Sequence, residues 1–402
     1  MITLGITRLL TEHQEWIEGK SVGLLTNHTG VDENLIHTIE LLAGFNLVAL
    51  FSPEHGLWGA AQDGVKITDT QYRQPVLLDS EGGQDETDNL CNRPTLQIYS
   101  LYGSTPLEWT EILKNIDVII YDIQDVGVRY YTYLGTLFET MKTLENVIET
   151  GKCVECIVAD RPNPIGGIHI EGPMLEPSYA SLVGPYPIPV RYGLTIGEIA
   201  KLFHAEQGFT FPLKIAQMSG WNRDMWFDET GLLWVPPSPN MPTLETATLY
   251  PGTCLFEGSN LSEGRGTTKP FEHIGAPWID NQKWLTRLNA KQFPGILFRP
   301  IVFTPQFSKY EGEVCNGVAI HITDKKQVSP IELTVWMLST LSDEFPNDFK
   351  LWEAHFDRLA GSDALRNALL AGNPFEEVEE WSAEIKASNI IWRERREPHL
   401  LY

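Results

Sequence analysis

Residues 47–59 read LVALFSPEHGLWG and change from apolar to charged within a few positions. The apolar, β-branched beginning of this stretch predicts a buried strand. A proline and a glycine flank the two ionisable residues that follow, Glu54 and His55, so the strand is expected to end before them. The stretch therefore predicts a carboxyl group and an imidazole in a loop at the end of a core strand.

Three further segments in the first 170 residues share this pattern. Residues 21–26, 117–121 and 155–159 are mostly apolar, and each run precedes a polar loop that contains glycine or proline. Apolar side chains with helical spacing lie between the strands, at 34–43 and 131–150. Strands that alternate with helices predict βαβ units, a parallel sheet and the α/β fold class.

The four polar loops predict one shared ligand site. In parallel sheets, ligands bind beyond the carboxyl ends of the strands. Because all four loops leave the sheet at that edge, their side chains should converge on one crevice. The side chains expected there are Asn27, Glu54, His55, Asp122, Gln124, Asp125, Asp160, Arg161 and Asn163.

The pattern changes after residue 170, and the simplest partition has domains at 1–170 and 171–402. Residues 231–279 are dense in proline, glycine, tryptophan and hydroxyl side chains. A loop-rich segment of that length is typical of a functional region. The other elements expected are a helix at 194–207 with a capping box at Thr195 and Glu198, strands at 295–303 and 317–323, and a helix at 330–341.

The composition limits the class of partner. The 402 residues include 53 acidic and 30 basic side chains, a formal net charge of −23. This charge repels nucleic acid and anionic membranes, so neither is expected as a partner. No signal peptide and no run of about 18 apolar residues is seen, which predicts no membrane insertion. The expected location is cytoplasmic for the chain as given, or periplasmic or secreted if a leader was removed.

The cysteines and one acidic segment favour structural roles. Five cysteines in a chain of this length do not imply a disulfide framework. Cys153 and Cys156 have C-x-x-C spacing, but Cys156 begins an apolar run, so a core thiol is favoured over a redox or zinc pair. The acidic segment 81–93 lacks apolar periodicity and is expected to be a mobile surface loop.

Three other kinds of chemistry find little support. No G-x-G-x-x-G follows the early strands, and residues 258–269 lack the Walker spacing, which argues against a nucleotide cofactor. No G-x-S-x-G elbow is present for a serine nucleophile. No zinc or metalloprotease spacing is present either. No cofactor and no metal are therefore expected; the side chains that could still ligate a metal are His28, His55, Asp122 and Asp125.

Carboxylates beside hydrogen-bonding aromatic side chains remain, and this mixture is typical of sugar binding. Glycoside cleavage needs a protonated carboxyl group near the leaving oxygen and often a second carboxylate. Glu54, at an apolar strand end among other acids, is placed where burial and like charge favour the protonated form. The alternative is that Glu54 only caps a loop or a helix.

Arginines in polar segments of so acidic a chain indicate an anionic group on the substrate. Each arginine could instead pair with a neighbouring carboxylate of the protein. The arginines concerned are Arg129, Arg161, Arg191 and Arg265.

Seven motifs resemble those of the bacterial exo-β-N-acetylmuramidase family, long catalogued as a domain of unknown function. They are LLTNHTGVD, FSPEHGLWG, YDIQDVGVRYYTY, VADRPNPIGG, EGPML, PIPVRYGLTIGEIA and PPSPNMPTLETATLYPGTCLFEGSNLSEGRGTTKPFEHIGAPWI. The resemblance runs from about residue 19 to residue 324, in the family's motif order. This chain has Arg191-Tyr192 where the family motif has Arg-His, and the secretory leader that the family often carries is not seen.

The resemblance implies a Rossmann-like amino-terminal domain, a smaller α/β (α+β) carboxy-terminal domain and an active site in the cleft between them. It implies release of N-acetylmuramic acid from the non-reducing ends of peptidoglycan fragments, as in muropeptide recycling, with Glu54 as the catalytic acid. The lactyl carboxylate of muramic acid is then the anion expected at the arginines.

Several roles follow for this chain. His55 is expected to orient Glu54 or the substrate, and Asp125 or Asp160 to be the second carboxylate, unless the substrate's acetamido group acts as the nucleophile. A non-catalytic protein that binds cell-wall sugars, or a hydrolase of another acidic sugar or an ester, is the alternative. The expected substrate-binding residues are Asn27, Gln124, Arg129, Tyr131, Arg161, Asn163, Arg191, Asn240, Asn260, Glu263 and Arg265.

Overall fold

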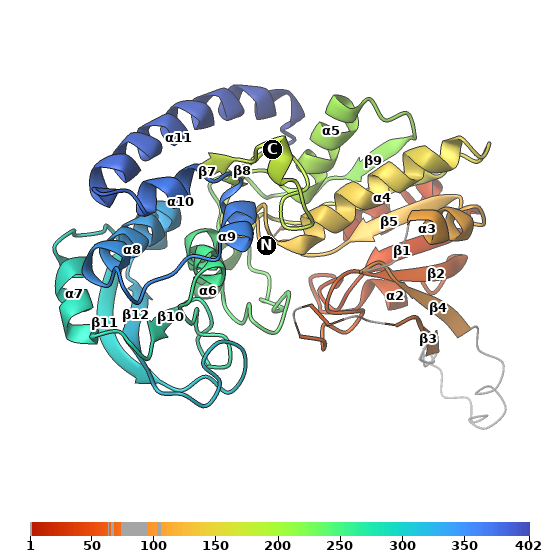
Figure 1. Ribbon diagram of the computed structural model, residues 1–402. Helices are drawn as coiled ribbons and strands as arrows, with labels where there is room; N and C mark the ends of the chain where they lie inside the picture. The colour runs from red at the N-terminus through yellow and green to blue at the C-terminus, as the bar shows by residue number, and fades with distance from the viewer. Residues whose placement is uncertain (1, 63, 66–67, 74–94, 103–105) are drawn as a thin grey trace. The chain divides into compact units, whose positions relative to one another are not determined.

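The computed structural model describes residues 2–62, 64–65, 68–73, 95–102 and 106–402 (Figure 1). The acidic segment at 81–93 and Cys91 lie outside the described residues. The chain forms two compact units. Each unit is a group of residues that contact one another, and it includes several separate stretches of the chain. The expected division of the sequence at residue 170 therefore stays a prediction. Unit 1 comprises residues 1–124, 136–162 and 196–221, and unit 2 comprises residues 125–135, 163–195 and 222–402.

Unit 1 contains a seven-stranded sheet in the order β3-β4-β2-β1-β5-β6-β9. Every neighbouring pair is parallel except β3 with β4. Numbered along the chain, the parallel strands lie in the order 3-2-1-4-5-6, which is that of a Rossmann fold. The predicted parallel sheet and the Rossmann-like fold are thereby confirmed. The strands are β1 Val22–Thr26, β2 Leu47–Ser52, β3 Thr70–Arg73, β4 Thr95–Ser100, β5 Val118–Asp122, β6 Glu155–Ala159 and β9 Leu213–Ala216.

The helices predicted around the first strands are confirmed with one correction. The helix expected at 34–43 is reduced to α2, because Leu35 has a φ of 65°, which a right-handed helix does not allow. The His37 ring then caps this short helix by accepting a hydrogen bond from Ile39 N at 3.1 Å. The helices that lie wholly or mostly in unit 1 are α1 Gly5–Glu12, α2 Thr38–Leu41, α3 Pro106–Leu113, α4 Thr132–Ile148 and α5 Ile196–Gln207.

The strand order of unit 1 reverses at one point. The chain builds outward from β1 through β2 to β4 and then returns to β5 on the other side of β1. Thr26 pairs in register with Asp122, so the carboxyl ends of β1 and β5 lie side by side. Open α/β sheets bind their ligands outside the carboxyl ends of the strands at such a reversal.

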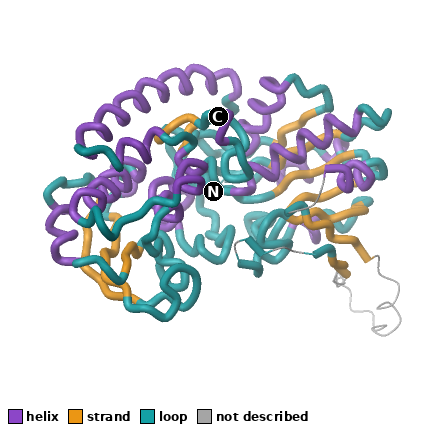
Figure 2. Tube along the Cα trace, viewed as in Figure 1, coloured by secondary structure: helices purple, strands orange, loops and turns teal. Residues whose placement is uncertain are grey.

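Unit 2 contains the three-stranded antiparallel sheet β10-β12-β11 and the two-stranded ribbon β7-β8 (Figure 2). The strands predicted at 295–303 and 317–323 and the helix at 330–341 are confirmed as β11, β12 and α8. Helix α6 lies in the segment without clear periodicity; its residues 246–253 are all buried, and a helix buried on every side has no amphipathic pattern. The strands are β7 Glu171–Met174, β8 Pro189–Arg191, β10 His273–Ala276, β11 Ile296–Phe303 and β12 Cys315–Ile322. The helices are α6 Leu244–Thr253, α7 Asn281–Asn289, α8 Pro330–Glu344, α9 Glu353–Ala360, α10 Ala364–Leu369 and α11 Pro374–Arg396.

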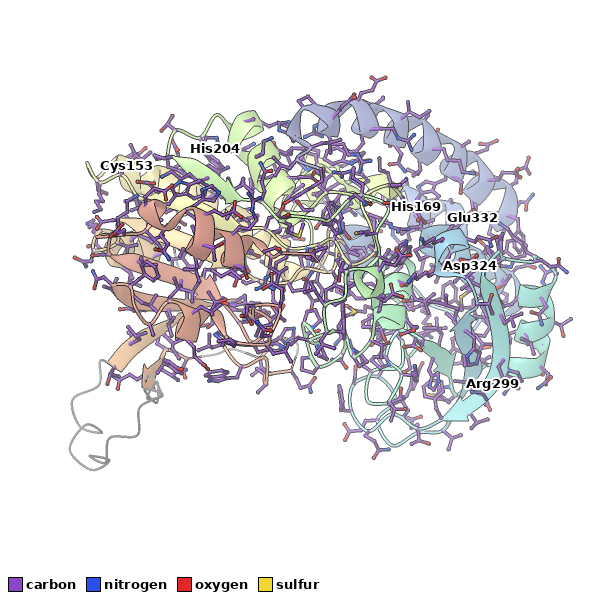
Figure 3. All side chains as sticks on the ribbon, turned by 180° about the vertical axis from the view of Figure 1, so that it is seen from behind. Cys153, His169, His204, Arg299, Asp324 and Glu332 are labelled. Carbon is purple, nitrogen blue, oxygen red and sulfur yellow. The ribbon has the colours of Figure 1, made fainter. Side chains whose placement is uncertain are left out.

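Two further predictions concern the core. Cys156 is buried in β6, and burial raises the pKa of its thiol to about 12, which confirms a core thiol. Cys153 lies exposed on the surface of unit 1 (Figure 3). None of the helices in the described ranges combines the length and the apolar character needed to cross a membrane.

Candidate active site

Glu54 lies in the loop that follows β2, as the sequence predicts. Glu54 is 3% exposed, and Gly64 N donates a hydrogen bond to Glu54 Oε1 at 3.1 Å. The next residue, His55, is buried and has a φ of 69°. Such strain costs roughly 1–3 kcal/mol in a residue other than glycine, and it clusters at functional sites. His55 Nδ1 lies 2.8 Å from Ala61 O, so the ring is held by its own loop.

The loop after β2 packs against the loop after β1. Gly59 has a φ of 65°, and a Cβ at this position would lie 2.0 Å from the His28 ring. Only glycine permits so close an approach in this conformation. Leu25 and Phe51 pair in register, so the two loops leave neighbouring strands at the same edge of the sheet.

Asn27 follows β1 at the strand reversal and is completely buried. Its Oδ1 accepts hydrogen bonds from Thr29 N at 2.9 Å and from Thr29 Oγ1 at 2.6 Å. Gln124 N donates to Thr29 Oγ1 at 2.9 Å, and Gln124 Nε2 donates to Pro162 O at 2.9 Å. Asn27 Nδ2 has no hydrogen-bond partner among the described residues. This amide group is oriented yet unsatisfied, and buried groups in that state call for a ligand or a water molecule.

Two serine hydroxyl groups at the same edge share this property. Ser52 ends β2, Ser100 ends β4, and the two residues are partners in register. Both hydroxyl oxygens are buried, and no residue within the described ranges forms a hydrogen bond with either. An unsatisfied buried group costs about 1–3 kcal/mol. A ligand that forms hydrogen bonds with these hydroxyls would therefore be stabilised at this edge.

Asp122, Asp160 and Arg161 hold the loops of this edge together. Arg161 Nε donates to Asp122 Oδ1 at 2.5 Å, and Arg161 Nη2 donates to Val31 O at 2.9 Å. Asp160 Oδ1 accepts hydrogen bonds from Arg161 N at 3.0 Å and from Gly197 N, in the first turn of α5, at 2.8 Å. A carboxylate in this place satisfies the helix N-terminus and complements its dipole. The bonds of Asp160 and Arg161 therefore support the loops themselves.

Trp58 adds an exposed aromatic face to the Glu54 loop. Trp58 is 56% exposed, and the ring centroids of His37 and Tyr72 lie 5.8 and 5.9 Å from that of Trp58. A large, rigid ring with one open face suits stacking against the apolar face of a sugar.

Asp125 is a buried carboxyl group of unit 2. Burial raises the pKa of Asp125 to about 6, although hydrogen bonds to its Oδ1 oppose the rise; the donors are Gly127 N at 2.6 Å and Tyr192 Oη at 2.9 Å. Tyr192 occupies the position at which the resemblance leads us to expect histidine. A carboxyl group with this pKa gains and loses its proton near neutral pH, as acid–base catalysts do.

Two of the arginines expected at the substrate form internal bonds in unit 2. Arg129 is completely buried, and its terminal nitrogens donate to three backbone carbonyls at 2.7–2.9 Å. Arg191 Nη1 pairs with Glu171 Oε1 at 2.7 Å, and Arg191 Nη2 donates to Ile165 O at 2.5 Å. Both guanidinium groups therefore organise the fold of this unit. The carbonyls bound by Arg129 are those of Pro173, Ile188 and Leu359.

Arg265 lies close to two carboxylates of unit 2, those of Glu257 and Glu263. Arg265 Nη2 lies 2.7 Å from Glu257 Oε1, and Arg265 Nε lies 3.4 Å from Glu263 Oε1. Glu263 Oε2 lies 3.0 Å from Lys309 Nζ. The Arg265 side chain is 14% exposed, against 4% for Arg161 and 2% for Arg191.

The remaining predicted binding residues of unit 2 serve mainly its own structure. Asn163 Nδ2 donates to Leu194 O at 2.9 Å, and Asn260 Nδ2 donates to Asp348 O at 2.8 Å. Asn240 and Tyr131 are buried, and the Tyr131 ring meets the rings of two other tyrosines edge-on. These tyrosines are Tyr133 and Tyr250.

The sequence analysis does not predict a role at these sites for Ser52, Ser100, Trp58 and Tyr192. Ser52 and Ser100 each end a strand directly before a loop, which is the signal that could identify them. Trp58 stands in the same motif as Glu54. Tyr192 offers no such signal, because its bond to Asp125 joins residues 67 positions apart. No group of three or more His, Cys, Asp or Glu side chains that could hold a metal ion occurs within the described ranges.

Comparison with known protein sequences identifies the family that this chain matches. Sequence models of the family described as exo-beta-N-acetylmuramidase NamZ match residues 22–245 for its N-terminal part and residues 248–402 for its C-terminal part. A peptidoglycan beta-N-acetylmuramidase NamZ of Bacillus subtilis is 42% identical to this chain over 381 residues. The match covers 94% of this chain and 86% of that relative.

Two solved structures resemble the fold over its whole length. Both are DUF1343 family proteins of Bacteroides fragilis. One has a TM-score of 0.83 and 35% sequence identity, and the other a TM-score of 0.71 and 26% identity. Each match covers 100% of this chain and 99% of the other chain.

Proposed function

Because the chain belongs to the exo-β-N-acetylmuramidase family, we propose that Glu54 is the general acid with which it releases N-acetylmuramic acid from the non-reducing ends of peptidoglycan fragments. The chain is a glycoside hydrolase, and the family match does not favour a purely sugar-binding role. One observation carries the assignment of Glu54. It is a buried carboxyl group at the carboxyl end of β2, beside a strand reversal where Asn27 Nδ2 has no hydrogen-bond partner in the described part of the chain.

The proposed reaction begins with proton transfer from Glu54 to the glycosidic oxygen. The bond between this oxygen and the sugar's anomeric carbon then breaks, and water completes the hydrolysis. The hydrogen bond from Gly64 N holds one carboxyl oxygen in place. Asn27 Nδ2 donates to an oxygen of the sugar, and Trp58 stacks against the sugar ring. His55 and Gln124 position these groups through their bonds within the same loops.

Asp125 is the proposed second carboxylate. Asp160, the other candidate, accepts hydrogen bonds from two backbone N–H groups, those of Arg161 and of Gly197 at the start of α5. Asp125 has a pKa of about 6 and can therefore act as an acid or a base near neutral pH. In the alternative mechanism, the substrate's own acetamido group replaces the second carboxylate. The Asp125→Asn variant would then retain most of the turnover.

Arg265 is the proposed partner of the lactyl carboxylate. Among the arginines expected at the substrate that pair with a carboxylate, it is the most exposed, and a bound lactyl group can replace its contact with Glu257. In this proposal, Arg129, Arg161 and Arg191 stabilise the fold and do not bind the substrate.

Two chromogenic glycosides test the function. The 4-nitrophenyl β-glycosides of N-acetylmuramic acid and of N-acetylglucosamine differ only in the lactyl group. We expect kcat/KM to favour the muramic acid compound by at least about 100-fold, because a site built around a bound group rejects the analogue that lacks it. Arg265→Met should narrow this preference, whereas Arg358→Met, an exposed position on α9, should not. Equal cleavage of the two glycosides would contradict the proposal.

A further inference from the structure

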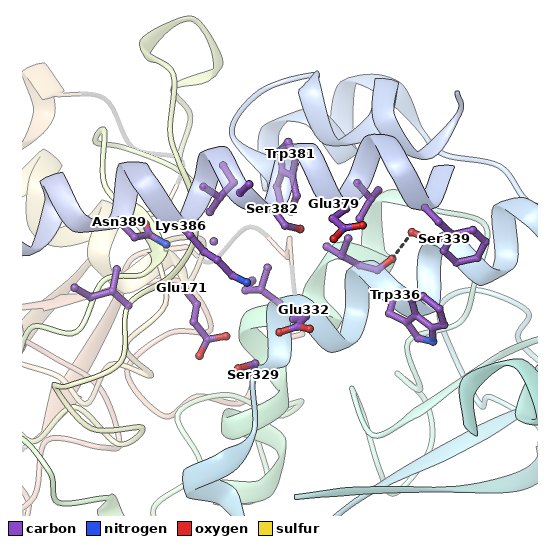
Figure 4. Close-up of a pocket in the computed structure, with 18 of the residues that line it drawn as sticks. Glu171, Ser329, Glu332, Trp336, Ser339, Glu379, Trp381, Ser382, Lys386 and Asn389 are labelled. Atoms are coloured by element: carbon purple, nitrogen blue, oxygen red, sulfur yellow. Dashed lines mark hydrogen bonds between the residues drawn. The ribbon is translucent and has the colours of Figure 1, made fainter. Parts of the chain in front are cut away.

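Unit 2 contains a cavity that includes no residue of the proposed catalytic site. It has a volume of about 690 Å³ and lies between α11, α8 and the start of β7 (Figure 4). Small-molecule sites fall in the range of roughly 300–1,000 Å³. The walls combine aromatic rings, hydroxyl groups and charges of both signs. Such a lining suits a ligand that is polar at its ends and partly apolar between them.

Two carboxylates of the lining are already neutralised. Glu171 Oε1 lies 2.7 Å from Arg191 Nη1, and Glu332 Oε1 lies 2.8 Å from Lys291 Nζ. Glu379 and Lys386, both on α11, form no ion pair with any residue in the described part of the chain. One negative and one positive charge of the cavity are therefore available to a ligand.

The spacing of these two charges defines the shape of the ligand. Glu379 and Lys386 stand seven residues apart on one helix, so they share a face and lie about 10.5 Å apart along its axis. Lys386 extends from α11 toward the side of the cavity formed by Glu171 and Glu332 (Figure 4). The two charges are too far apart along the helix to pair with each other. They mark the two ends of an elongated space.

Hydrogen-bonding and apolar groups fill the wall along α11 and α8. Ser382 lies between the two charges on the same helix face, and Asn389 Oδ1 is a buried acceptor without a donor among the described residues. Trp336 of α8 and Trp381 of α11 supply apolar surface. A chain of peptide groups with small apolar side chains matches this order of polar and apolar surface.

We propose that this cavity binds a free peptide of about three residues. Its α-ammonium group pairs with Glu379, and its terminal carboxylate pairs with Lys386. An extended chain advances about 3.3–3.6 Å per residue, so three residues span the distance between the two charges. The peptide groups bond to Ser382 and Asn389, and the side chains rest on Trp336 and Trp381.

Calorimetric titration of the whole protein with the tripeptide Ala-Leu-Ala tests this site. We expect binding of one peptide per chain. Capping the amino end by acetylation, or the carboxyl end as an amide, should each weaken binding by about threefold or more, the effect of one lost ion pair. An acetylated amino end also stands for a peptide that is attached to a sugar through that end, so the caps distinguish a free peptide from an attached one.

Matched variants assign each charge. Glu379→Gln should weaken binding of Ala-Leu-Ala and leave binding of the acetylated peptide unchanged. Lys386→Gln should weaken binding of Ala-Leu-Ala and leave binding of the amide unchanged. The control is Glu380→Gln on the same helix, which does not line the cavity. Absence of binding, or equal binding of capped and uncapped peptides, would overturn the proposal. The readout is binding and not turnover, so its failure would leave the role of Glu54 untouched.

Discussion

At the scale of the residue, Asp125 shows how burial changes the proton affinity of a carboxyl group. The pKa of this carboxyl group is about 6 in the folded chain, mainly because of burial. In the unfolded chain an aspartate titrates near 3.9. The folded state therefore holds its proton to a higher pH than the unfolded state does. The stability that this group contributes is present below about pH 4 and is lost as pH rises to about 6.

The Asp125→Asn variant should remove this pH dependence. A difference of about two pKa values corresponds to roughly 3 kcal/mol. The free energy of unfolding of the variant, minus that of the wild type, should therefore rise by about 3 kcal/mol between pH 4 and pH 7. Urea unfolding at a series of pH values measures this difference. A difference that stays constant with pH would contradict the account, and Asp224→Asn at an exposed position controls for the loss of one carboxyl group.

Arg129 is predicted to act in stability and not in substrate binding. In Arg129→Lys an ammonium group replaces the guanidinium group and cannot reach all three carbonyl partners, so at least one of them loses its donor. We expect a loss of about 3 kcal/mol in the free energy of unfolding, measured by urea denaturation without substrate. Arg358→Lys on the surface of α9 should have little effect. Unchanged stability with a raised KM would instead indicate contact with the substrate.

The sequence reading identifies individual site residues only where the signal is local. The positions of Glu54, Asn27 and Gln124 at the carboxyl ends of their strands could be predicted, because each lies within two residues of the end of an apolar strand. The structural task of Arg129 could not, because one of its carbonyl partners lies 230 positions away in the chain. The neighbouring sequence gives no indication of a contact between residues that lie so far apart in the chain.

At the scale of the element, the loop after β2 carries Glu54 and also contains strained backbone. His55 and Gly56 both have positive φ values, and Gly59 approaches the His28 ring too closely for any side chain. The Pro and Gly of the motif indicate the end of the strand, but not these conformations. The regular elements were easier to predict, because strands with one apolar run and helices with one apolar face carry their own periodicity. Residues 246–253 of α6 are all buried and therefore show no apolar face. Residues 34–43 do show helical spacing, but that spacing does not reveal the left-handed backbone at Leu35 that shortens the helix.

The Gly59→Ala variant tests the importance of this loop. An added Cβ would meet the His28 ring in a conformation that already disfavours alanine. We expect a loss of about 2 kcal/mol or more in stability and at least a tenfold loss in kcat/KM. Gly44→Ala is the control, because a Cβ there meets no atom within 4 Å. Full activity of Gly59→Ala would show that the loop conformation does not matter for catalysis.

At the scale of the whole molecule, the net charge of −23 opposes an anionic substrate. A muramic acid glycoside carries a lactyl carboxylate, so long-range repulsion slows its approach. Salt screens such repulsion over about 10 Å at 0.1 M. The same charge is the reason why the composition predicts no nucleic-acid partner, whereas the local arrangement of arginines cannot be predicted from composition.

Salt should therefore accelerate turnover of the anionic substrate. Between 10 and 200 mM NaCl we expect kcat/KM for the muramic acid glycoside to rise roughly two- to fivefold. The methyl ester of the lactyl group removes the charge and should show no such rise. A decrease of kcat/KM with salt would mean that a local positive field, and not the net charge, governs the approach of the substrate.

The central claim is that Glu54 donates the proton to the leaving group. The Glu54→Gln variant should be measured on two substrates, a muramic acid disaccharide and the 4-nitrophenyl glycoside. A sugar leaving group needs protonation, whereas 4-nitrophenolate leaves without it. The account predicts a fall in kcat of about 10²–10⁴-fold on the disaccharide, a much smaller fall on the nitrophenyl compound, and no change for Glu18→Gln. Equal losses on both substrates, or no loss on the disaccharide, would contradict it.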